Sequence, residues 1–138
     1  MANEAVIIEL VAGQNAVRRT CVDGASISKG TICLLSGSNV VLATNAVSTG
    51  KAFGGVAAHD KIAGDGSTNI SCWMDGVVDL TNAPTAVTAI VAGSGVSISG
   101  ANLVKYVTAG ELLTGALIGY SEEEAAVNDV FRVRLRGT

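Results

Sequence analysis

The chain repeats a stretch of its own sequence, and this repeat limits the folds it can adopt. Residues 52–65 align with residues 116–129 at a constant offset of 64, with Ala, Gly and Asp at matching positions. A second pair of segments, residues 27–32 and 98–103, aligns at an offset of 71, which predicts about seven extra loop residues in the first copy. The chain is therefore expected to be two variations on one β unit.

The end of the chain alternates apolar and charged side chains, a pattern typical of a half-buried strand. One side carries Phe131, Val133 and Leu135, and the other carries Arg132, Arg134 and Arg136. Upstream, short apolar runs recur about every ten residues, separated by turns in a chain with 17 glycines. This spacing predicts an all-β fold, a small compact β-barrel or sandwich with an internal two-fold repeat.

Residues 17–138 are predicted to form a single β-barrel-like domain, and residues 1–16 either a projecting N-terminal arm or the first strand of the domain. An extended terminal arm would pair with the edge of another chain's sheet. If residues 2–10 form such an arm, deleting them should leave a folded protein that no longer binds its partner. An unfolded deletion product would instead make the segment a core strand.

Two segments are ambiguous in the sequence. Residues 85–92 are rich in β-branched side chains and are expected to form a strand, although their alanines would also suit a short helix. Residues 122–126 could form one helical turn, with Ser121 as its N-cap.

The composition of the chain limits the classes of function that it can have. Only 15% of residues are charged, against about 25% in an average soluble domain, which favours a surface partly covered by a partner. The net charge of -3 gives no case for nucleic-acid binding, and no apolar run approaches the roughly 20 residues that cross a bilayer. The three cysteines are expected to be reduced and buried, in a protein made in a cytoplasm.

The sequence contains no recognisable catalytic or metal-binding pattern, so we expect neither an enzyme nor a cofactor. His59 is the only histidine and aligns with Glu123 in the repeat, which favours two variants of one surface turn over catalysis. Residues 45–52 lack the first glycine and the final hydroxyl of a phosphate-binding loop. Residues 64–66 and 122–124, and the carboxylates Asp75 and Asp79, lack calcium-loop spacing and are interpreted as surface turns.

The chain resembles the small head-decoration, or capsid-cement, proteins of tailed bacteriophages and related viruses. The resemblance covers nearly all of the chain after Arg18. It rests on Gly54-Gly55-Val56-Ala57, Ala63-Gly64-Asp65, Asp75-Gly76-Val77-Val78-Asp79-Leu80, residues 110–119 and Val130-Phe131-Arg132-Val133-Arg134-Leu135, after an apolar N-terminal segment.

The resemblance implies a homotrimer on the outer surface of an expanded icosahedral virion, where it bridges subunits of the major capsid protein against internal DNA pressure. It implies that the N-terminal arm adds a strand to the capsid protein. The candidate contact residues are Ala2, Asn3, Glu4, Val6, Ile7, Ile8, Leu10, Arg132, Arg134 and Arg136. The three arginines could contact an acidic partner or simply form a solvated face.

The sequence departs from the family pattern at residues 82–100, which are interpreted as an insertion. Two other functions remain open. One is a carbohydrate- or host-surface-binding module displayed on a virion, for which the aromatic content of 4% offers little support. The other is a small β-barrel enzyme or enzyme subunit.

Overall fold

The computed structural model describes residues 4–9, 16–36, 39–42, 52–84, 89–107 and 117–136. These residues form eleven strands and no helix, so the prediction of an all-β fold is confirmed. The strands are β1 (Val6–Glu9), β2 (Val17–Thr20), β3 (Ile32–Ser36), β4 (Asn39–Leu42), β5 (Ala52–Ala57), β6 (Asn69–Trp73), β7 (Asp75–Asn82), β8 (Gly95–Gly100), β9 (Leu103–Tyr106), β10 (Leu117–Ser121) and β11 (Val130–Arg136).

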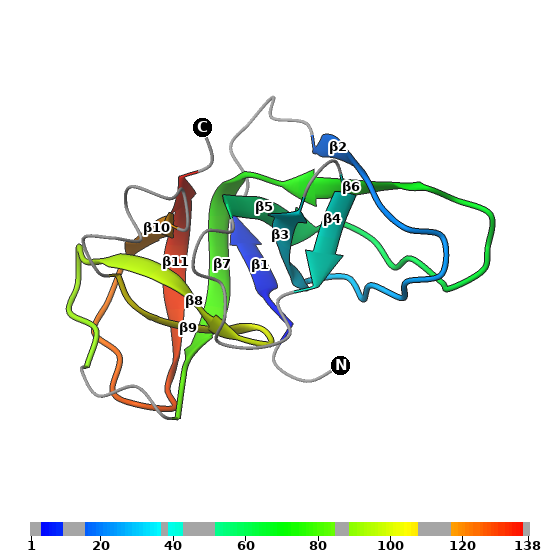
Figure 1. Cartoon of the computed structure of the whole chain (residues 1–138). Helices are drawn as coiled ribbons and strands as arrows, with labels where there is room; N and C mark the ends of the chain where they lie inside the picture. The colour runs from blue at the N-terminus through cyan, green and yellow to red at the C-terminus, as the bar shows by residue number, and fades with distance from the viewer. Residues whose placement is uncertain are drawn as a thin grey trace.

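The strands form two sheets that repeat one topology (Figure 1). The first unit, β2 to β6, has the strand order β2-β6-β5-β3-β4, and the second unit, β7 to β11, has the matching order β7-β11-β10-β8-β9. A parallel pairing of β9 with β7 closes the second unit into a ring, and β1 joins the same sheet along β7. The internal repeat seen in the sequence is therefore a repeat of structure.

Loop hydrogen bonds repeat as well. Ile27 forms an isolated antiparallel bridge with Lys61, and Ile90 forms the same bridge with Ala125. The Gly30 N–H donates to the Ala57 carbonyl over 2.8 Å, and the Gly93 N–H donates to the Ser121 carbonyl over the same distance. Both glycines have a φ of 87°, in the region that glycine adopts without strain.

This correspondence corrects the second sequence alignment. The structural counterpart of Ile27 is Ile90, not Ile98, so the offset stays near 64 and the first unit has no extra loop at this point. Residues 82–100 contain the Ile90 bridge and the strand β8, which both have counterparts in the first unit. The interpretation of this segment as an insertion relative to the family pattern stays a prediction. Similar short runs of Ile, Ser and Gly occur at both positions, and only the hydrogen bonds distinguish them.

The two ambiguous segments also differ from expectation. Residues 85–88 lie outside the described residues. Residues 89–92 form no strand, because Ile90 makes only an isolated bridge and the next strand, β8, begins at Gly95. Residues 122–126 contain no helix. The Ser121 hydroxyl does accept the Glu123 N–H over 3.2 Å, but the chain then bends so that Ala125 can bridge to Ile90. Tertiary pairing overrides the local helical tendency.

The main core contains buried side chains from both units, including Ile32 and Phe53 of the first unit and Ile118 and Phe131 of the second. A smaller core lies within the first unit. It consists of Cys21, Ile27, Cys33, Ala57, Ile70 and Cys72.

All three cysteines are free and buried, as the sequence predicted. The hydrogen bond with Cys72, together with burial, raises the pKa of the Cys33 thiol. The same hydrogen bond lowers the pKa of Cys72. These thiols belong to the packing of the first unit.

Two hydrogen bonds tie the units together. The buried Asn102, in the β8–β9 turn, accepts the Ile32 N–H on its Oδ1 over 2.9 Å. Its φ of 57° is a left-handed conformation that asparagine tolerates better than most residues. Just before β1, the Ala5 N–H donates to the Gly30 carbonyl over 2.6 Å.

Candidate interaction surfaces

The N-terminal candidates Val6, Ile7 and Ile8 belong to a strand of the chain's own sheet. Val6–Glu9 pair antiparallel with β7, and the preceding Ala5 is buried in the main core. Deleting residues 2–10 would therefore remove a strand from this sheet. A deletion experiment could then not distinguish a loss of binding from a loss of folding. Of the candidates, Ala2, Asn3 and Leu10 lie outside the described residues, and the side chains of Ile7 and Ile8 do as well.

The structure brings one N-terminal candidate, Val6, onto the same face of the sheet as Arg132 and Arg134. Val6 lies opposite Asp79, which in turn lies opposite Arg132, and directly paired side chains share a face. Arg134 lies opposite Tyr120 on the other side of β11. Together with Val130, two residues before Arg132 on the same face, these side chains form what we call the arginine face: Val6, Asp79, Tyr120, Val130, Arg132 and Arg134.

The arginine face combines charge with exposed apolar surface. Val6 is 58% exposed and Val130 is 65% exposed. Arg134 forms an ion pair with Glu122, with 2.9 Å between Nη2 and Oε1, and both side chains are well exposed, so the pair contributes about 0.2–1 kcal/mol. Among the described residues, the Arg132 guanidinium has no ion-pair partner. Arg136 ends β11 opposite Asp75, and its side chain is not described.

The side chains of His59 and Glu123 accept equivalent backbone hydrogen bonds in the two units. His59 Nε2 accepts the Ser71 N–H over 3.2 Å, and Glu123 Oε1 accepts the N–H of Arg132, the counterpart of Ser71, over 3.0 Å. With Nε2 as an acceptor, Nδ1 carries the proton and donates to the Asp60 carbonyl over 3.1 Å. Both side chains connect the start of a turn to the following strand by a hydrogen bond. This agrees with the prediction that they belong to two variants of one surface turn.

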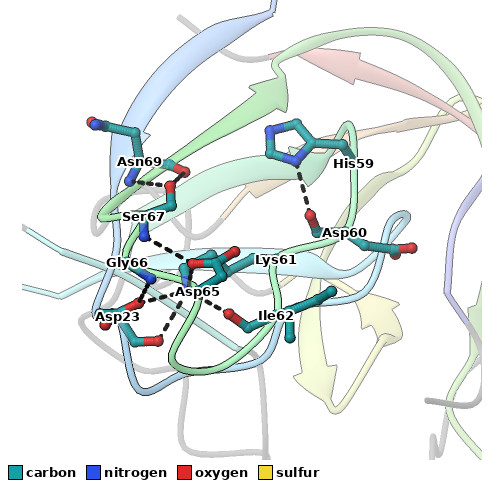
Figure 2. Close-up of polar contacts among 9 residues, drawn as sticks. All are labelled: Asp23, His59, Asp60, Lys61, Ile62, Asp65, Gly66, Ser67 and Asn69. Atoms are coloured by element: carbon teal, nitrogen blue, oxygen red, sulfur yellow. Dashed lines mark hydrogen bonds and ion pairs between the residues drawn. The ribbon is translucent and has the colours of Figure 1, made fainter.

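A buried lysine joins two loops at one end of the first unit (Figure 2). The Lys61 side chain is 1% exposed. Its Nζ donates to the Asp23 carbonyl over 2.9 Å, to the Ile62 carbonyl over 2.8 Å and to Asp65 Oδ1 over 2.9 Å. Asp23 Oδ1 lies 3.4 Å from the same nitrogen. The ammonium group therefore has oxygen partners from both loops.

Further hydrogen bonds fix these loops to each other. The Gly64 N–H donates to the Asp23 carbonyl over 2.8 Å, and the Gly66 N–H donates to Asp23 Oδ1 over 2.8 Å. We call residues 22–25 and 61–66 the Lys61 tip. In Figure 1 its two loops, blue and green, extend together beyond the strands at the right of the view.

Charge interactions within the Lys61 tip shift two pKa values. Desolvation acts to lower the pKa of Lys61, but hydrogen bonds to Asp65 and Asp23 outweigh it, and the pKa is raised above 10.5. The hydrogen bond from Lys61, followed by that from the Ser67 N–H, lowers the pKa of Asp65 below 3.8. Each group is thus stabilised in its charged form.

These shifts predict how acid acts on the fold. A carboxylate whose pKa is lowered on folding stabilises the protein at pH values above its unfolded pKa, and this contribution is lost as the pH falls through the folded value. We expect Asp65→Asn to lower the urea midpoint at pH 7 and this difference to shrink below pH 3.8. Urea titrations over a pH series measure it, with the exposed Glu124→Gln as the control. A difference that stays constant into strong acid would contradict the assignment.

The sequence did not reveal the Lys61 tip, because residues 64–66 look like an ordinary surface turn. One available signal was that Lys61 aligns with Ala125, so a long cationic side chain replaces a methyl group at a position whose counterpart is buried. The tip also exposes apolar side chains, with Val22 at 52% and Ile62 at 68%.

The described residues were also compared with the patterns of a metal site and of a membrane-spanning helix. The described residues contain no group of three or more His, Cys, Asp or Glu side chains placed to hold a metal ion. They also contain no helix long and apolar enough to span a membrane. No family model matches the chain, and a search of curated proteins finds no significant relative.

Proposed function

We propose that this chain is a structural capsid decoration protein, which binds the outer surface of an icosahedral viral head and stabilises it by bridging subunits of the major capsid protein. The observation that carries the proposal is the arginine face. Residues from the two ends of the chain meet there, and arginines, a tyrosine and exposed valines lie side by side. Protein interfaces are enriched in arginine and aromatic side chains.

The sheet that carries the arginine face supports the same proposal. The face lies on paired strands of a sheet that shares its core with the first unit. A contact surface that is already ordered loses little entropy on binding. Many copies of a modest contact around a closed shell would together stabilise that shell strongly.

We expect Arg132→Glu to weaken binding to decoration-free shells about tenfold or more, because a carboxylate would replace a guanidinium that has no ion-pair partner among the described residues. Co-sedimentation of the purified protein with shells measures the effect. Arg18→Glu makes the same charge change on the exposed edge strand β2 of the first unit, and serves as the matched control.

If both variants bind like wild type, the arginine face is not the shell contact. If wild type itself fails to sediment with shells, the proposed function is wrong. Counting this chain against the main shell protein in purified particles by mass spectrometry adds an independent test, in which a ratio near one to one is expected.

A further inference from the structure

The ring of His59 supplies a hydrogen-bond acceptor at the point where β5 ends. The Ala58 N–H donates to the Ser71 carbonyl over 2.8 Å, as it would if the antiparallel pairing with β6 continued. The chain then bends at residues 58–59, and the Ser71 N–H donates to His59 Nε2 over 3.2 Å. The imidazole ring therefore takes the place of a backbone carbonyl of the sheet.

The second unit completes the same bend with a carboxylate. The Glu122 N–H donates to the Arg132 carbonyl over 2.9 Å, and the Arg132 N–H donates to Glu123 Oε1 over 3.0 Å. A carboxylate ordinarily stays ionised down to about pH 4, whereas an imidazole ordinarily takes up its proton between about pH 5 and 8. The two bends thus use acceptors that fail in different pH ranges.

Protonation of the ring removes the acceptor in the first unit. In the neutral ring Nδ1 carries the proton and donates to the Asp60 carbonyl over 3.1 Å, so Nε2 can accept the Ser71 N–H. In the imidazolium both nitrogens carry protons, and the Nε2–H would point at the Ser71 N–H. Two donors cannot form this hydrogen bond, so the charged ring must turn away from β6.

Among the described residues, charged groups from three other segments lie near this bend. Arg18 of β2 lies opposite Ser71 in the sheet, and Lys29 belongs to the loop that donates its N–H to Asp60 Oδ1 over 2.7 Å. Glu4, just before β1, interacts electrostatically with Asp60. Both signs of charge therefore surround the ring, and the geometry of its hydrogen bond to β6 is the feature that distinguishes its two forms.

We propose that His59 makes the bend of the first unit sensitive to mild acid. On protonation the ring releases the Ser71 N–H and the bend loosens from β6, while the Glu123 bend of the second unit stays closed. The opening is local, because Lys61 and Asp65, which follow in the chain (Figure 2), form an ion pair whose carboxylate has a pKa below 3.8. This inference goes beyond the proposed function and does not depend on it.

Nuclear magnetic resonance of the whole chain, labelled with nitrogen-15, tests the proposal at about pH 7.5 and about pH 5.5. His59 is the only histidine, so the imidazole nitrogen signals report on it alone. At the higher pH we expect the tautomer with the proton on Nδ1. On acidification we expect the protection factor of the Ser71 amide against hydrogen exchange to fall about threefold or more, and that of the Arg132 amide to change by less than about twofold.

His59→Glu is the matched variant, because it gives the first unit the side chain that the second unit already has. We expect its Ser71 amide to keep its protection over the same pH range, as the Arg132 amide does. A wild-type ring with the proton on Nε2 at about pH 7.5 would overturn the proposal. So would an unchanged Ser71 protection factor, equal falls at Ser71 and Arg132, or a fall in His59→Glu as large as in wild type.

Discussion

Gly119→Ala should destabilise the second unit severely, lowering the free energy of unfolding by about 3 kcal/mol or more. A Cβ atom at this position would lie 2.0 Å from the Arg134 carbonyl oxygen and 3.0 Å from the Leu135 Cα. Both are backbone atoms of β11, which pairs with β10 at this point and with β7 on its other side. The strand cannot shift away without disturbing the closed ring of the second unit.

Gly100→Ala is the matched control, because it is also a strand glycine of the same sheet. A Cβ there would meet only the Leu103 Cδ1, at 3.8 Å, which is ordinary contact. We expect this control to change stability by less than about 1 kcal/mol. Urea unfolding followed by the fluorescence of Trp73, the only tryptophan, measures both variants. Equal midpoints for the two would show that β10 and β11 approach each other less closely than the structure has them.

Lys61→Met should destabilise the first unit strongly. The substitution keeps an apolar stem but removes the ammonium group, so the carbonyls of Asp23 and Ile62 lose a shared donor. Breaking a buried ion pair by removing one partner is strongly destabilising, although exposure of the carboxylates lets water compensate in part. We expect the melting temperature to fall on the order of 10 °C at pH 7.

The control is Lys29→Met, at an exposed lysine in a neighbouring turn of the same unit. Because the pKa of Lys61 is raised on folding, its contribution is present below pH 10.5 and is lost as the pH rises through the folded value. Melting curves of both variants and wild type at pH 7 and at strongly alkaline pH test this. Equal melting temperatures for the two variants at pH 7 would mean that Lys61 does not hold the tip together.

Local patterns predicted much of the fold. The alternation from Phe131 to Leu135 identified β11 and its inward side, since period-two burial is a property of the strand itself. The repeat of residues 52–65 at 116–129 was also correct. The shared glycine, Gly55 and Gly119, lies in the equivalent strands β5 and β10, and the shared aspartate, Asp65 and Asp129, lies in the loop after each strand.

Other elements depend on partners distant in the chain. The strand β8 begins and ends in glycine and contains two serines, so its composition resembles a turn, and pairing with β9 and β10 makes it a strand. Lys61 is buried only because Asp23, on another loop, supplies oxygen atoms to it. No local pattern could have predicted either result.

For the candidate contact residues too, local patterns predicted some features, while others depend on partners distant in the chain. Alternation placed Arg132 and Arg134 together on one side of a strand, and composition marked the N-terminal segment as extended. That Val6 lies in the same row as Arg132 depends on β7 running between them, with Asp79 opposite both. A sheet order of this kind cannot be read from either segment alone.

The core shared by the two units means that neither unit would be a stable protein by itself. Without the second unit, several core side chains of the first unit would lose apolar partners, namely Ile32, Leu34, Phe53 and Val56. The Ile32 N–H would also lose its hydrogen bond to the Asn102 side-chain oxygen. The whole chain is therefore the smallest cooperative folding unit.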